Sequence, residues 1–171
     1  MDVSDWKDVI GEYVKENGFV KHQIDSFNDF VEFGIQKIID EIGPIEISTK
    51  EDSRGGKATY IISFDKINIK KPVIRENDGT TNIMYPQEAR NRNLTYHSCI
   101  YCDMSVKTIK NGEETIKISR EQLGFLPIMV KSKFCLLHGK SEIELAKLGE
   151  CIYDEGGYFI VNGNEKAIVS Q

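Results

Sequence analysis

The chain has 171 residues, of which 40% are hydrophobic and 29% are charged, and its formal net charge is −5. A chain of this length can form one domain that buries roughly 70% of the surface exposed by the unfolded chain, so folding requires neither disulfides nor a metal. The composition is that of a globular protein, no apolar run approaches the length of a membrane helix, and the negative charge argues against a protein that coats nucleic acid by itself.

Two amphipathic helices are expected at the N-terminus. Residues 5–17 place apolar side chains at i, i+3, i+4, i+7 and i+8, and Gly18 suits the left-handed position that follows a helix. A second helix is expected after residues 25–26 and should stop at Gly43, which precedes a proline. We expect both apolar faces to pack into the core.

From residue 45 the pattern becomes typical of β-strands, with turn-rich segments between them. A short helix is expected over residues 86–92, and Asn111-Gly112 predicts a hairpin turn. The apolar run that contains Pro127 also resembles a strand, and the proline favours an edge or a bulge. The expected strands cover residues 45–47, 59–64, 67–73, 94–109, 115–119 and 126–130.

Residues 141–171 carry two specific local signals. Ser141 and Glu144 have the spacing of a capping box, which predicts a short helix over residues 142–148. Two β-rich runs then flank Asn162-Gly163, the dipeptide best suited to a type I′ hairpin turn. The fold class is therefore α+β, with N-terminal helices followed by a mostly antiparallel sheet with hairpins.

Four residues imitate a zinc site, because Cys99 and Cys102, and likewise Cys135 and His138, are separated by two residues. Zinc-binding pairs of this kind lie on tight turns, whereas the first pair lies in an expected strand. Residues three apart in a strand point to opposite faces. We therefore expect no metal and interpret the cysteines as buried free thiols, with a zinc protein as the alternative.

The sequence contains no complete catalytic set. Gly139-Lys140-Ser141 resembles the end of a phosphate-binding loop, but Phe134 stands where that loop needs its first glycine. The carboxylates are scattered and only three histidines are present. No catalytic residue is assigned.

The start of the chain is acidic and lacks the basic and apolar blocks of a signal peptide. We therefore expect an intracellular, reducing compartment, without distinguishing nucleus, cytoplasm or virion. The charge is uneven: residues 86–140 hold nine Lys/Arg and five Asp/Glu, a balance of +4, and the remainder has a balance of −9. The basic segment is compatible with phosphate contact or with an ordinary solvated surface.

Five blocks resemble, in the family's order, the second-largest (beta-type) subunit of multisubunit DNA-directed RNA polymerases, in the eukaryotic, archaeal or large-DNA-virus style. The last block, Gly-Tyr-Phe-Ile-Val-Asn-Gly-Asn-Glu-Lys followed by a glutamine five residues later, is a signature of that family. The blocks cover residues 18–31, 85–96, 124–132, 148–158 and 157–171.

The resemblance implies that residues 1–171 are the N-terminal part of the protrusion domain of that subunit, as a single and truncated domain. It implies a part of the cleft wall that positions the DNA template and the RNA–DNA hybrid, with an isolated chain that is inactive. The expected partners are the other polymerase subunits, chiefly the largest subunit and the rest of the second-largest one, together with template and hybrid but no membrane. No cofactor is expected in this chain, since the family's Mg²⁺ is bound mostly by the largest subunit. The alternative is a stand-alone binding or assembly module.

Four residues are candidates for contact with nucleic acid. Lys166 and Gln171 match a cation and an amide of the family's last block, where they could hold RNA phosphates and sugars. Arg90 and Arg92 lie two apart in an expected helix and so point to different faces. The alternative is structural: Lys166 could pair with a neighbouring carboxylate, and either arginine could bind acids or carbonyls of its own fold.

Overall fold

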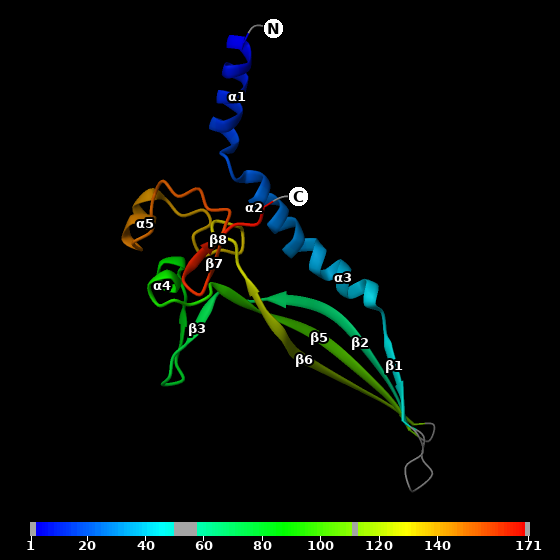
Figure 1. The fold of residues 1–171 in the computed structure, drawn as a ribbon. Coiled ribbons are helices and arrows are strands. Elements are labelled where there is room, and N and C mark those ends of the chain that lie inside the picture. The colour runs from blue at the N-terminus through cyan, green and yellow to red at the C-terminus, as the bar shows by residue number, and fades with distance from the viewer. Residues whose placement is uncertain (1–2, 50–57, 111–112, 170–171) are drawn as a thin grey trace. The chain divides into compact units, whose positions relative to one another are not determined.

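A computed structural model describes residues 3–49, 58–110 and 113–169 (Figure 1). Its contacts divide the chain into two compact units. Unit 1 comprises residues 1–29, 71–98 and 127–171, and unit 2 comprises residues 30–70 and 99–126. The helices are α1 (Val3–Asn17), α2 (Lys21–Asp29), the π-helical turn η1 (Phe30–Gly34), α3 (Ile35–Ile42), α4 (Pro86–Asn91) and α5 (Glu142–Lys147). The α+β fold class expected from the sequence is confirmed.

Unit 2 contains a four-stranded antiparallel sheet in the order β1-β2-β5-β6. The register pairs Ile45 with Ile62 in the first two strands, and Ala58 with Lys110 in the next two. The helix α3 lies against β2 (Figure 1). The strands are β1 (Ile45–Ser48), β2 (Ala58–Ile69), β5 (His97–Lys110) and β6 (Glu113–Pro127).

A bulge interrupts β2 where the pairing with β5 shifts between Phe64 and Ile67. A bulge leaves backbone groups outside the ladder, and buried groups of this kind need another partner. The side-chain amide of Gln36 on α3 fills this role, because it donates to the Asp65 carbonyl at 2.9 Å and accepts from the Ile67 amide at 2.9 Å. The sequence predicted two strands here, over 59–64 and 67–73, whereas the single strand β2 continues through the bulge, covers the first range and ends at Ile69 within the second.

Unit 1 combines two hairpins with short helices and irregular segments. The hairpins pair β3 (Val73–Arg75) with β4 (Thr81–Ile83), and β7 (Phe159–Val161) with β8 (Asn164–Lys166). The strand expected over 126–130 is wrong beyond Pro127, where β6 ends. The fully buried residues of the next segment, Ile128 and Val130, instead donate single backbone hydrogen bonds to separate segments of unit 1.

The expected burial of the N-terminal apolar faces is wrong for α1 and partly wrong for the second helix. On α1, the side chains of the apolar stripe are between 53% and 62% exposed at Trp6, Val9, Ile10 and Tyr13. Further along, Phe27 and Val31 are buried but Ile38 and Ile42 are about half exposed. The periodicity correctly indicated helices in both regions, but the second begins at Lys21, before residues 25–26, and contains the π-helical turn η1. The periodicity reports an apolar face and does not report what covers that face. None of the helices within the described ranges is long and apolar enough to span a membrane.

The capping box at α5 is confirmed. The Ser141 hydroxyl accepts from the Glu144 amide at 3.4 Å, and the Glu144 carboxylate accepts from the Ser141 amide at 2.8 Å. We expect Ser141→Ala to lower the free energy of unfolding by about 1 kcal/mol, because it removes an N-cap acceptor. Urea denaturation followed by circular dichroism measures the change. A loss as small as that of Lys147→Ala in the last turn of the same helix would contradict a role for the cap.

Candidate nucleic-acid interface

The β7–β8 hairpin turns through Asn162 and Gly163, whose φ angles are +51° and +76°. Positive φ at both central positions is the requirement of a type I′ turn, so the hairpin predicted from this dipeptide is confirmed. The turn also lies close to the end of α4. A Cβ added at Gly163 would lie 2.7 Å from the Oδ1 of Asn93 and 3.1 Å from the Arg90 carbonyl oxygen, so glycine is needed for space as well as for conformation.

Backbone hydrogen bonds attach the hairpin to segments distant in sequence. The Gly163 amide donates to the Leu94 carbonyl at 2.9 Å, and the Tyr96 amide donates to the Ile160 carbonyl at 3.0 Å. Just before β7, the Val130 amide donates to the Tyr158 carbonyl at 2.8 Å. The side chains of Tyr96 and Ile160 are fully buried beneath these bonds. The hairpin is therefore attached to the core of unit 1 through β7 and the turn, while β8 is exposed.

A network of side chains around the Arg90 guanidinium joins α4, the loop after α5 and the hairpin; we call it the Arg90 cluster. The Nη1 of Arg90 donates to Glu150 at 3.0 Å, and the Nε of Arg90 donates to Glu165 of β8 at 3.0 Å. Its Nη2 donates to the Tyr158 hydroxyl and lies 3.6 Å from the Asp154 carboxylate. The members of the cluster are Gln87, Arg90, Glu150, Asp154, Tyr158 and Glu165.

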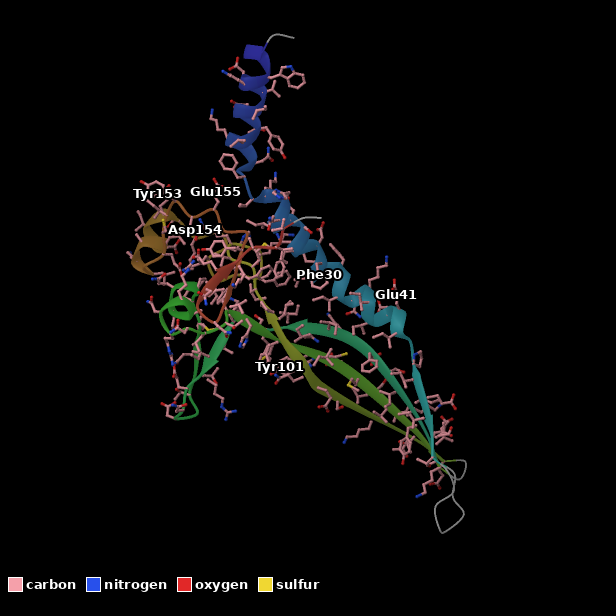
Figure 2. The ribbon with its side chains drawn as sticks, in the orientation of Figure 1. Phe30, Glu41, Tyr101, Tyr153, Asp154 and Glu155 are labelled. Carbon is pink, nitrogen blue, oxygen red and sulfur yellow. The ribbon has the colours of Figure 1, made fainter. Side chains whose placement is uncertain are left out.

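Glu150 is the buried centre of this cluster, with a side chain only 2% exposed. One carboxylate oxygen accepts from Arg90, and the other accepts from the backbone amide of Gln87 in the first turn of α4 at 2.7 Å. A carboxylate is stable at such a depth only when it is paired and hydrogen-bonded, as it is here. Burial, and then the hydrogen bond that its hydroxyl donates to Asp154, raise the pKa of Tyr158 well above its usual value, so this phenol stays protonated. Figure 2 shows Asp154 on the loop that precedes β7.

Arg92 points to a different set of partners. Its guanidinium makes two hydrogen bonds to Glu76, at 2.6 and 2.9 Å, and one to Glu88 at 3.0 Å. Glu76 lies in the turn of the β3–β4 hairpin, where its amide donates to the Thr80 carbonyl at 2.9 Å. Arg90 in the last turn of α4 and Arg92 at its C-cap thus point to different partners, as their spacing predicts, and each contacts one carboxylate of a different hairpin.

Lys166 is exposed on β8 and does not join the Arg90 cluster. Successive residues of a strand point to opposite faces, and Glu165 faces Arg90, so Lys166 faces the other way. Within the described ranges, no hydrogen bond or ion pair engages its ammonium group. Its cross-strand partner Phe159 contacts the ring of Phe27 with centroids 5.5 Å apart. The fourth candidate, Gln171, lies outside the described residues.

No local sequence pattern indicates the Arg90 cluster, because its acidic members lie 60 to 75 residues from Arg90 along the chain. Of the residues that imitate a zinc site, Cys99 and Cys102 belong to β5 in unit 2, and Cys135 and His138 belong to unit 1. Across the described ranges, no group of three or more His, Cys, Asp or Glu side chains could hold a metal ion.

The sequence of the whole chain was compared with protein families and with known proteins. The model of the family described as "RNA polymerase beta subunit" matches residues 18–171. The chain is 40% identical over 175 residues to DNA-directed RNA polymerase II subunit 2 of Arabidopsis thaliana, a match that covers 95% of this chain and 15% of that protein. It is 44% identical over 170 residues to DNA-directed RNA polymerase subunit Rpo2N of Methanocaldococcus jannaschii, which covers 96% of this chain and 32% of that protein. The chain therefore spans less than a third of the length of these relatives.

Proposed function

The chain belongs to the RNA polymerase beta subunit family and corresponds to the N-terminal part of the second-largest subunit, and we propose that it helps form the cleft wall that positions the DNA template and the RNA–DNA hybrid. In this proposal residues 1–171 are the N-terminal part of the protrusion domain. The observation that carries it is the firmly attached β7–β8 hairpin, which presents Lys166 without a partner among the described residues.

A cation on a rigid support is suited to hold a phosphate at a fixed place. Contacts to phosphates and sugars position a nucleic acid without reading its sequence. The contribution to catalysis is then orientation, which lowers the barrier without supplying a reactive group. Arg90 and Arg92 remain candidates, although each would first have to leave the carboxylates that it binds here. Gln171 remains a candidate on the resemblance alone.

We assign the reactive chemistry to other parts of the polymerase. Joining nucleotides with two metal ions requires clustered ligands, and the described residues offer no group of three that could hold one ion. On the resemblance to the family, we propose that the Mg²⁺ ions lie chiefly on the largest subunit, and the isolated chain is expected to be inactive. The proposed partners are the largest subunit, the remainder of the second-largest subunit, and the nucleic acids, in an intracellular polymerase.

The role of Lys166 is tested with Lys166→Gln in an assembled polymerase bound to a synthetic RNA–DNA scaffold. Loss of one phosphate contact should shorten the lifetime of the complex and reduce the slope of log affinity against log salt by about one. Lys117→Gln, which removes an exposed lysine of β6, should change neither quantity. An unchanged slope and lifetime for Lys166→Gln would remove this residue from the interface.

A further inference from the structure

We propose that Arg90 is a positioning residue, whose guanidinium holds the Glu165 face of β8 and thereby presents Lys166 on the opposite face of the hairpin. This inference rests on the function proposed above for the hairpin. It assigns to Arg90 an indirect part in binding nucleic acid, in place of the direct phosphate contact that its charge alone suggests.

The first argument is that the guanidinium is already occupied. All three of its nitrogens donate to side chains of the chain itself, and its side chain is only 18% exposed. The forked donors of arginine suit simultaneous binding of several acceptors, which the single ammonium group of lysine does not reproduce. Contact with an external phosphate would require Arg90 to leave the buried carboxylate of Glu150, which would then be uncompensated.

The second argument concerns charge balance. Three carboxylates, those of Glu150, Asp154 and Glu165, approach one guanidinium. Without Arg90 these three carboxylates would repel one another. The repulsion would displace the carboxylate that is least held by its surroundings. Glu165 is that group, because its side chain is 58% exposed whereas the side chain of Glu150 is buried. Loss of Arg90 should therefore release β8 in particular.

The third argument links this release to Lys166. Glu165 and Lys166 are adjacent in β8, and the strand fixes their side chains on opposite faces. Besides its backbone pairing with β7, β8 is held by the contact between Glu165 and Arg90, which fixes the face that Glu165 occupies. The position of the Lys166 ammonium then depends on a guanidinium that lies on the other side of the hairpin.

The test is a double-mutant cycle in the assembled polymerase on the same RNA–DNA scaffold. Arg90→Gln and Lys166→Gln should each reduce the salt slope by about one, and the double variant should reduce it by about one as well, because both remove the same contact. A reduction of about two in the double variant would mean that Arg90 binds a phosphate directly. If Lys166→Gln reduces the slope but Arg90→Gln leaves it unchanged, Arg90 is only structural. Either of these two results would overturn the proposal.

Amide hydrogen exchange of residues 159–166 in the same assembly gives a second readout, which does not depend on nucleic acid. Loss of charged hydrogen bonds in Arg90→Gln should speed exchange in the hairpin about tenfold or more, and Arg90→Lys should not restore protection. Arg120→Gln, which breaks an exposed pair with Asp103 on another sheet, is the matched control and should leave the hairpin unchanged. Equal protection in wild type and Arg90→Gln would overturn the proposal.

Glu165→Ala covers the case in which Arg90→Gln does not assemble. It removes only the contact between the cluster and β8, and leaves the buried pair of Arg90 and Glu150 intact. It should speed exchange in β8 and reduce the salt slope, and failure to do either would count against the proposal. If Lys166→Gln leaves the slope unchanged while exchange responds as expected, the proposed function of Lys166 fails and the positioning of the hairpin by Arg90 stands.

Discussion

Replacing Gly156 by alanine should lower the free energy of unfolding by about 2–5 kcal/mol, through a left-handed backbone and an overpacked core together. Gly156 has a φ of +79°, and a Cβ built there would lie 2.5 Å from the Val130 carbonyl oxygen and 2.8 Å from the Cβ of Lys131. That carbonyl cannot move away without cost, because it accepts the Gly157 amide at 3.1 Å. Urea denaturation of the chain followed by circular dichroism measures the loss.

Gly79→Ala separates the two causes. Gly79 has a φ of +85°, but a Cβ there would meet nothing within 4 Å. It should therefore lose only the about 1–2 kcal/mol of a left-handed non-glycine residue. Equal losses at the two positions would show that the contact with Val130 is relieved by a small backbone shift and contributes nothing.

Glu150→Ala is the second substitution with a large expected effect, about 3–5 kcal/mol, because it breaks a buried ion pair from one side. It leaves the mostly buried Arg90 with fewer partners and removes the acceptor of the Gln87 amide at the start of α4. Glu150→Gln should be milder, since its amide oxygen can still accept one of these hydrogen bonds. The same denaturation experiment compares the two variants.

The control for Glu150 is Glu114→Ala. Glu114 pairs with Lys107 at 2.8 Å on β5 and β6, and its side chain is 55% exposed. An exposed pair of this kind contributes about 0–1 kcal/mol. If Glu150→Ala were no more destabilising than Glu114→Ala, the Arg90 cluster could not be what holds α4, the loop and the hairpin together.

Features set by neighbouring residues were predicted well from the sequence. The capping box of α5 and the Asn162-Gly163 turn each depend on two to four adjacent residues, and the structure confirms both. The helix α4 was likewise predicted over 86–92 and is found over Pro86–Asn91. In these cases a local rule of hydrogen bonding or backbone conformation decides the outcome.

Features that depend on distant segments could not be predicted in this way. The bulge of β2 is satisfied by Gln36, which lies on another element. The segment after Pro127 has the composition of a strand, yet its amides bind two different segments and form no ladder. The interpretation of Arg90 as either a phosphate ligand or a structural fork was open in the sequence, because its acidic partners come from two later parts of the chain.

The short helix α4 also limits how the length of this chain can vary during evolution. Arg90 and Arg92 anchor different hairpins from opposite faces of one helical turn and a half. An α-helix turns by about 100° per residue, so inserting or deleting one residue before Arg90 would rotate both guanidinium groups away from their carboxylates at once. Homologues that keep both arginine contacts should therefore carry no insertion or deletion within residues 86–92.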